Sequence, residues 1–385
     1  MAYGGNNLMN MVLHKVYAAQ RNKFKGSGNS NGFAYSYDVT DVPVARLVAN
    51  SSTHNLEMDL KTDVTAMGGI INFAGNLSMM ATGKLAISQG KLSLTALKII
   101  PTTNNVIDRA VISLINSAIV PMISNTLSTI PIPQLTNVFG TGLSAGIQTA
   151  KVIAGPALEV GARIAGRTGI AAADAPGNLA SLNSGNATNA QLIALVSGAA
   201  ANELVKATTP ALSHNFDKRG SGAGFGAGIK GTIKSSIPVL EVKNGSGIAS
   251  TTISFTGLKG GIRIPIKGWT WLSLPAPSVK VVITHDLTSS GNSGIIKLTG
   301  VSAISVSFSW PTILKPVEAV LKTLLNGILT LFRGMISNAV SGRKFELFKL
   351  PSTIPGTNLG ATLSFTPGGL SYFKSSIQAI VQIRG

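Results

Sequence analysis

The sequence of 385 residues contains no cysteine. This absence excludes disulfide bonds, thiolate metal sites and cysteine nucleophiles in one step. It also favours a cytoplasmic or bacterial protein, because secreted eukaryotic chains often carry a disulfide. Charged residues are scarce, at 12% of the chain, against about 25% in an average soluble domain. With 44% hydrophobic residues, this composition excludes a disordered chain and predicts a large core beneath an uncharged polar surface.

Acidic residues are few, with 14 against 32 basic residues, and the formal net charge is +18. Such an imbalance favours an anionic partner, which can be a nucleic acid, a phosphorylated lipid or an anionic membrane. Aromatic residues make up only 5% of the chain, which is too few for a platform on which bases stack. Composition therefore disfavours nucleic acid and leaves lipid or phospholipid and anionic membrane surfaces as the expected partners.

The N-terminal residues 1–22 lack a continuous apolar segment, because Lys15 and Arg21 interrupt the apolar spacing. The segment therefore does not have the pattern of a signal peptide. The expected location is the cytoplasm or the membrane periphery of a bacterium, with secretion by another route left open.

Two long segments have the spacing of amphipathic helices. No charged residue occurs between 110 and 150, and the apolar residues there recur at i, i+3 and i+4. This periodicity predicts a helix with a neutral polar face rather than a membrane span. A second apolar stripe continues over residues 315–341 for about seven turns, and a stripe of that length must be covered by another element.

One structural plan is used twice along the chain. Shorter helices are predicted over 6–22 and 189–207, and each is followed by strand-like segments and then by one of the long helices. Closing strands are clear only in the second half. A repeat of this length indicates two related domains rather than a solenoid. The predicted domains are 1–170 and 189–385, joined by a linker at 171–188 that is rich in alanine, glycine, serine and asparagine.

Catalytic and metal motifs are weak. The four histidines have no metal-ligand spacing, so no metal site is predicted. Ser144 lies in a Gly-x-Ser-x-Gly match, but a nucleophile elbow needs a strand before the serine and a helix after it. Gly226, Gly228 and Gly231 form a Gly-x-Gly-x-x-Gly match, but strand-like alternation follows it where a nucleotide fingerprint requires a helix. We predict no catalytic residues and no enzymatic activity.

Trp269 and Trp271 are separated by one residue, so both indoles lie on one face of a predicted strand. Tryptophan is enriched at the lipid–water boundary, and neighbouring basic residues would form a rim around such an anchor. A core-facing pair beside a solvated basic sheet face is the alternative. The predicted membrane or headgroup contacts are Lys259, Arg263, Lys267, Trp269, Trp271 and Lys280.

The region from about Lys315 onward resembles the end of a tubular lipid-binding (TULIP) domain, as in the bactericidal/permeability-increasing protein family. The resemblance is carried by the helix 317–340, the segments 345–351 and 363–365, and the terminal strand 371–383. Residues 106–140 resemble the corresponding part of a first domain. The chain lacks the cysteine pair typical of animal members, which favours a bacterial relative.

This resemblance implies an α+β fold with two tandem wrapped barrels in an elongated body. Each barrel would be a highly curved antiparallel sheet around a long amphipathic helix, with an apolar lipid pocket between them. We therefore predict non-enzymatic lipid binding or transfer, with a bound lipid or fatty acid and no other cofactor. The predicted pocket residues are Ile115, Ile119, Met122 and Ile123 in the first half, and Leu321, Leu325, Ile328, Phe332 and Met335 in the second.

Two alternative functions stay open. One is an anionic-glycolipid-binding or membrane-active protein. The other is a structural or toxin-complex accessory protein whose pockets are vestigial. The lipid, the number of occupied pockets and the oligomeric state are not predicted.

Overall fold

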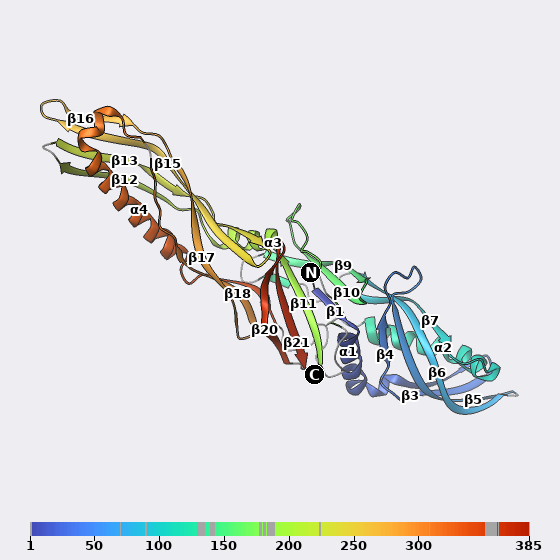
Figure 1. Ribbon diagram of the computed structural model, residues 1–385. Helices are drawn as coiled ribbons and strands as arrows, with labels where there is room; N and C mark the ends of the chain where they lie inside the picture. The colour runs from blue at the N-terminus through green and yellow to red at the C-terminus, as the bar shows by residue number, and fades with distance from the viewer. Residues whose placement is uncertain are drawn as a thin grey trace. The chain divides into compact units, whose positions relative to one another are not determined.

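The computed structural model describes residues 2–69, 71–88, 91–128, 135–138, 143–176, 179, 182, 189–222, 225–307, 309–350, 360 and 362–384. The chain divides into two compact units. Unit 1 comprises Met1–Val196, Phe348–Leu370 and Gln378–Gly385, and unit 2 comprises Ser197–Leu347 and Ser371–Ile377. Each unit has a curled antiparallel sheet beside a long helix (Figure 1), in agreement with the predicted wrapped-barrel class. The domain bounds and the tandem arrangement stay predictions.

Unit 1 contains a curled six-stranded sheet in the order β2-β3-β5-β6-β7, with β4 paired to β5. Residues alternate between buried and exposed along β5, so one face of the sheet packs on the core. The helix α2 (Val106–Ser128) packs against β7, β6 and β2. The strands are β2 (Lys25–Ser30), β3 (Phe33–Val39), β4 (Val44–Leu47), β5 (Leu56–Gly68), β6 (Ile71–Ser88) and β7 (Lys91–Pro101).

A seven-stranded sheet, most of which belongs to unit 1, joins strands from both ends of the sequence. Its order is β20-β21-β11-β1-β10-β9-β8. The short helix α1 (Asn6–Ala19) and the turn η1 (Arg21–Phe24) follow β1. The strands are β1 (Ala2–Gly5), β8 (Leu135–Val138), β9 (Leu143–Ile153), β10 (Ala157–Ile164), β11 (Asn189–Ser197), β20 (Thr362–Phe373) and β21 (Ser376–Arg384).

One secondary-structure prediction is wrong for part of its length in this sheet. Residues 189–197, predicted to be helical, form β11, because pairing with β1 on one side and β21 on the other outweighs their helix propensity. The helix α3 (Gly198–Thr208) begins only after Ser197, whose side chain accepts a hydrogen bond from the Ala200 amide at 3.2 Å. The first half also has its closing strands, β9 and β10, which the sequence did not show clearly.

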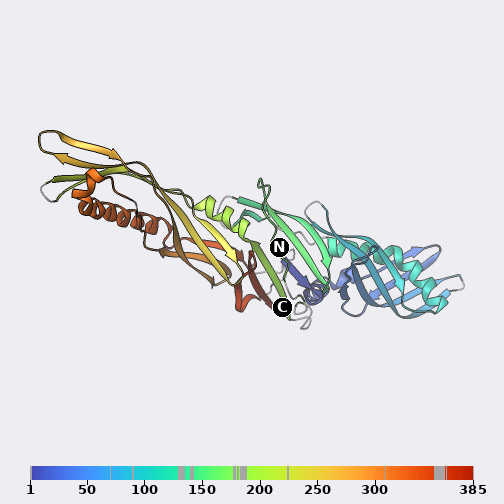
Figure 2. The same cartoon turned by 45° about the horizontal axis from the view of Figure 1, so that its top comes forward.

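Unit 2 contains a curled eight-stranded sheet in the order β12-β13-β15-β17-β18-β19, with β14 and β16 each paired to β15. The turn η3 (Thr312–Val317) leads into the long helix α4 (Glu318–Val340), which lies along one face of the sheet in Figure 1 and Figure 2. Residues 303–307 and 309–310 form no strand. The strands are β12 (Ser213–Gly222), β13 (Phe225–Ser235), β14 (Val239–Lys243), β15 (Ser246–Ile264), β16 (Gly268–Ser273), β17 (Ser278–Ser290), β18 (Ser293–Val301) and β19 (Lys344–Lys349).

The two curled sheets follow the same element order. In each, a short helix precedes a hairpin, a short edge strand and a long strand. Two further strands in unit 1, and three in unit 2, then lead to the long helix. One difference separates them. β6 pairs with the whole length of β5, whereas the corresponding partner of β15 is divided into β16 and β17. The break contains Pro275 and Pro277, which have no amide proton to donate to the ladder.

Both long helices are apolar and long enough to cross a membrane when judged by length and composition alone, over Val106–Ser124 and Thr312–Val340. In the structure one stripe of each helix packs on a curled sheet. This is the amphipathic arrangement that the sequence predicts.

Candidate functional site

The helix α4 brings the predicted pocket residues of the second half onto one face. Leu321, Leu325, Ile328 and Phe332 are buried, and Met335 is half-buried. The helix packs against β12, β13 and β18. The interior is therefore apolar, and its own side chains occupy it.

In unit 1 the helix α2 likewise brings the predicted pocket residues of the first half onto one face. Ile115, Ile119 and Ile123 are buried in a core cluster with the curled sheet, and Met122 packs against that cluster. Methionines line it on the sheet side as well, including Met58 and Met79, and methionine adapts its shape to irregular partners.

The two tryptophans on β16 form a stacked pair on the outer face of the unit 2 sheet, away from α4. Their ring centroids are 5.4 Å apart, and the ring planes differ by 19°. Glycines on the neighbouring strands make this position available. A Cβ added at Gly261 would lie 2.8 Å from Trp271, and one at Gly228 would lie 2.9 Å from Trp271 and 3.0 Å from Trp269. The Gly-x-Gly-x-x-Gly match is thus part of β13, where two of its three glycines underlie or border the indoles.

Two cations that the sequence analysis missed cover this pair. The Arg219 guanidinium lies 5.1 Å from the Trp269 ring centroid, and the Lys230 ammonium lies 4.2 Å from the Trp271 ring centroid. Such cation–π contacts add favourable electrostatic energy. Arg219 also pairs with Asp217 at 3.2 Å, and hydrogen bonding from Arg219 lowers the pKa of the Asp217 carboxyl. Local spacing could not reveal these contacts, because they depend on the register of four strands.

The structure places five of the six predicted headgroup residues near one another. Arg263 lies opposite Trp269 in the β15–β16 register, and Lys259 lies opposite Lys230 in the β13–β15 register. Lys267 lies exposed in the β15–β16 turn. Lys280 lies elsewhere, on β17, where it donates to Glu241 at 2.7 Å.

This part of unit 2 is strongly basic. Strands β12 and β13 and the segment 256–273 carry seven basic residues and one acidic residue, Asp217. The basic residues are Lys218, Arg219, Lys230, Lys234, Lys259, Arg263 and Lys267.

Unit 1 has a polar groove of about 490 Å³ on the corresponding strands. Two cross-strand rows of polar side chains line it. Ser36 and Thr65 bond to each other at 2.6 Å, and Asn76 donates to Asp63 at 3.0 Å. The lining residues are Lys25, Gly26, Ser27, Ser36, Tyr37, Asp38, Asp63, Val64, Thr65, Gly75 and Asn76.

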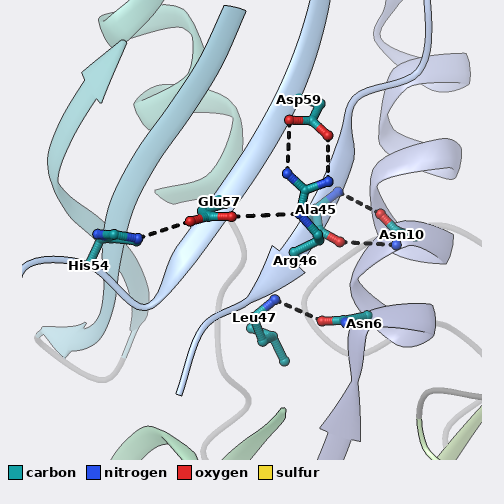
Figure 3. Close-up of polar contacts among 8 residues, drawn as sticks. All are labelled: Asn6, Asn10, Ala45, Arg46, Leu47, His54, Glu57 and Asp59. Atoms are coloured by element: carbon teal, nitrogen blue, oxygen red, sulfur yellow. Dashed lines mark hydrogen bonds and ion pairs between the residues drawn. The ribbon is translucent and has the colours of Figure 1, made fainter. Parts of the chain in front are cut away.

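A second polar cluster of unit 1 closes the edge of its sheet (Figure 3). The Asn10 side chain bonds to both the amide (2.7 Å) and the carbonyl (3.1 Å) of Ala45 on β4, and Asn6 accepts from the Leu47 amide at 2.7 Å. The side-chain amides of Asn10 and Asn6 thus bond to the edge strand β4 where the backbone of a neighbouring strand would otherwise do so. Asn202 of α3 repeats the device in unit 2, where it accepts from the Leu240 amide on β14 at 2.5 Å.

The same cluster contains a chain of hydroxyl, imidazole and carboxylate groups. Thr53 Oγ1 lies 2.9 Å from His54 Nδ1, and His54 Nε2 lies 3.1 Å from Glu57 Oε1. Arg46, which pairs with Asp59 at 2.6 Å, lies 3.6 Å from Glu57 (Figure 3). Thr53 is exposed on a loop, and the groove described above does not include it. We interpret the chain as a structural link between β4 and β5.

The remaining catalytic motif does not have the geometry of a nucleophile elbow. Ser144 is exposed within β9, and its carbonyl accepts from the Ala165 amide at 2.7 Å. No helix follows it directly, because the strand continues to Ile153. Among the residues that the structure describes, no group of histidine and carboxylate side chains could hold a metal ion.

No family model and no curated protein matches the sequence. The fold is similar to a crystal structure of a lipopolysaccharide binding protein, with a TM-score of 0.39 and 11% identity. That similarity covers 100% of this chain and 98% of the other. A similarity this remote transfers neither a ligand nor a residue role.

Proposed function

We propose that the protein binds lipid without enzymatic action, with the acyl chain held between a long helix and the sheet curled beside it. The observation that carries this proposal is that α2 and α4 each present one apolar stripe to such a sheet. Acyl chains need an apolar lining with few polar groups, and burial of each methylene contributes about 0.8 kcal/mol. Since side chains occupy these interiors, a lipid enters by displacing the more adaptable ones, such as Met122 and Met335.

The variants Leu325→Trp and Ile328→Trp test this proposal in unit 2, because an indole there would occupy the space of the acyl chain. The protein is incubated with phospholipid vesicles, separated from them and extracted, and the lipid recovered per protein is measured. We expect both variants to lower that ratio. The exposed neighbour Leu331 supplies the control, because Leu331→Trp adds the same indole outside the interior and should leave the ratio unchanged. Equal recovery from all three variants would show that the acyl chain lies elsewhere.

The basic outer face of unit 2 supports a second part of the proposal, in which the protein docks on anionic membranes or headgroups. Lys259, Arg263 and Lys267 supply cations near the tryptophan pair, and each basic residue near an anionic surface contributes about 1 kcal/mol. Raising the salt concentration should weaken vesicle binding sharply, because screening acts on exposed charges. Lipid held in the apolar interior should stay bound under the same conditions.

A further inference from the structure

Ile266 occupies the turn between β15 and β16 in a conformation that an isoleucine rarely adopts. Its φ angle is +72°, and a β-branched residue in this left-handed region is a genuine outlier. The side chain is also completely exposed, so no packing compensates for the strain. Strain of this kind concentrates at functional positions.

The base of this hairpin is well braced. Trp269 and Trp271 stack on the outer face and are covered by Arg219 and Lys230. On the opposite face a Cβ added at Gly260 would lie 2.8 Å from Leu314 of η3 and 3.2 Å from Leu274. Both faces of the hairpin base are thus occupied, and the strained turn projects beyond them.

The surroundings of the turn are apolar at the tip and cationic behind it. Phe225, at the start of the adjacent β13, and Ile313 of η3 are exposed, and η3 packs against β13 and β15. Arg263 and Lys267 flank Ile266 on either side along the chain. An exposed apolar tip with a cationic collar is complementary to an anionic lipid bilayer, whose phosphates lie outside its acyl chains.

We propose that Ile266 is the membrane-inserting residue of this protein, and that it enters the acyl boundary of an anionic bilayer while Arg263 and Lys267 contact the phosphates. Trp269 and Trp271 then stay outside the bilayer as the rigid base of the hairpin. This inference rests on the proposed docking function and assigns it a residue that does not belong to the tryptophan pair.

The variant Ile266→Asn separates insertion from folding. Asparagine accepts the left-handed conformation better than isoleucine, so the melting temperature should stay the same or rise. Binding to vesicles of phosphatidylcholine mixed with phosphatidylglycerol should weaken about tenfold, since burying an isoleucine side chain is worth at least one tenfold step in affinity. Met67, exposed near the end of β5 in the corresponding hairpin of unit 1, is the matched control, and Met67→Asn should bind like the wild type.

A single fluorescent label reports the insertion directly, because the chain has no cysteine of its own. Ile266→Cys and Met67→Cys each carry one environment-sensitive dye. With the anionic vesicles we expect a blue shift at position 266 and none at position 67, and little shift at either position with phosphatidylcholine alone. Wild-type vesicle binding by Ile266→Asn, or an unshifted dye at position 266 on bound protein, would overturn the inference.

Lipid extracted from the interior is a separate readout. Suppose that Ile266→Asn loses vesicle binding and still retains lipid that is presented in detergent. In that case the variant has lost membrane insertion but not lipid binding in the interior. If Leu325→Trp loses extracted lipid but still binds vesicles, the two roles are likewise independent.

Discussion

The same four-strand region has different surfaces in the two units. In unit 1, β2, β3 and the segments 61–69 and 71–76 carry two basic and two acidic residues, and their outer face holds a polar groove. In unit 2 the corresponding strands carry seven basic residues and one acidic residue, and a tryptophan pair covers their outer face. The two units therefore share an element order but differ in surface chemistry, and the cationic, aromatic surface belongs to unit 2.

The proline break between β16 and β17 accompanies this difference. β6 runs through 18 residues, whereas β16 has six residues and ends before Leu274–Pro277. The distal hairpin of unit 2 is thereby separated from the rest of its strand. The comparison indicates that the core holds each unit together and that surface chemistry near the hairpin distinguishes them.

The largest expected effect comes from removing the centre of one helix stripe. Phe332 is fully buried on α4, and Phe332→Ala should lower the free energy of unfolding by about 3–5 kcal/mol. Amide hydrogen exchange should accelerate in β12, β13 and β18 but not in β2–β7, because each helix packs on its own sheet. Leu331→Ala, at an exposed neighbouring position, is the control and should change little. Equal acceleration in both sheets would contradict this expectation.

A smaller effect is expected from the glycines beneath the indoles. Gly261→Val would place atoms 2.8 Å from Trp271 or closer, so the stack must move, at a cost of about 1–3 kcal/mol. Tryptophan emission should shift to longer wavelength as the indoles become wetter. The contrasting variant is Gly327→Ala on α4, where an added Cβ meets nothing within 4 Å. It should raise stability by up to about 1 kcal/mol and leave the emission unchanged.

The asparagines that bond to the edge strands should contribute different amounts to stability in the two units. Asn10 makes two bonds to β4, and Asn202 makes one described bond to β14. At about 1 kcal/mol per bond, Asn10→Ala should cost about 2 kcal/mol and Asn202→Ala about 1 kcal/mol in urea unfolding. Asn10→Asp, which keeps the acceptor for the Ala45 amide and loses the donor, should fall between wild type and Asn10→Ala. A larger loss from Asn202→Ala would reverse the comparison.

The smallest effect is a titration confined to unit 2. Burial raises the pKa of Tyr372 to about 12, and its hydroxyl lies 2.8 Å from His285 Nε2. The folded state holds the Tyr372 proton more tightly than the unfolded state. The protonated hydroxyl therefore contributes fully to the free energy of unfolding below pH 10, and this contribution declines as the pH rises from 10 to 12. Ultraviolet titration should show one tyrosine ionising near pH 12, and Tyr372→Phe should remove that step. Survival of the step in the variant would assign it to another tyrosine.

The parts that could be predicted from the sequence are those encoded by local periodicity. The stripes of α2 and α4 were predictable because burial repeats every turn, and this placed Ile115, Ile119, Leu325 and Phe332 correctly on the packed faces. β11 was not, because its state depends on pairing with distant strands. The contacts of Arg219 and Lys230 with the tryptophans could not be predicted for the same reason, because they depend on how distant strands pair. The exposure and φ angle of Ile266 could not be predicted either, because an apolar residue in a turn belongs to no periodic pattern.

Native mass spectrometry of the freshly purified protein, followed by organic extraction, tests lipid binding most directly. The account predicts a species heavier than the 39.6 kDa chain, whose extra mass extracts as phospholipid, fatty acid or another lipid. Its stoichiometry would show whether one or both helix–sheet interiors are occupied. A bare chain, still bare after incubation with lipid vesicles, would contradict lipid binding and favour an interaction protein whose apolar interiors serve only its stability.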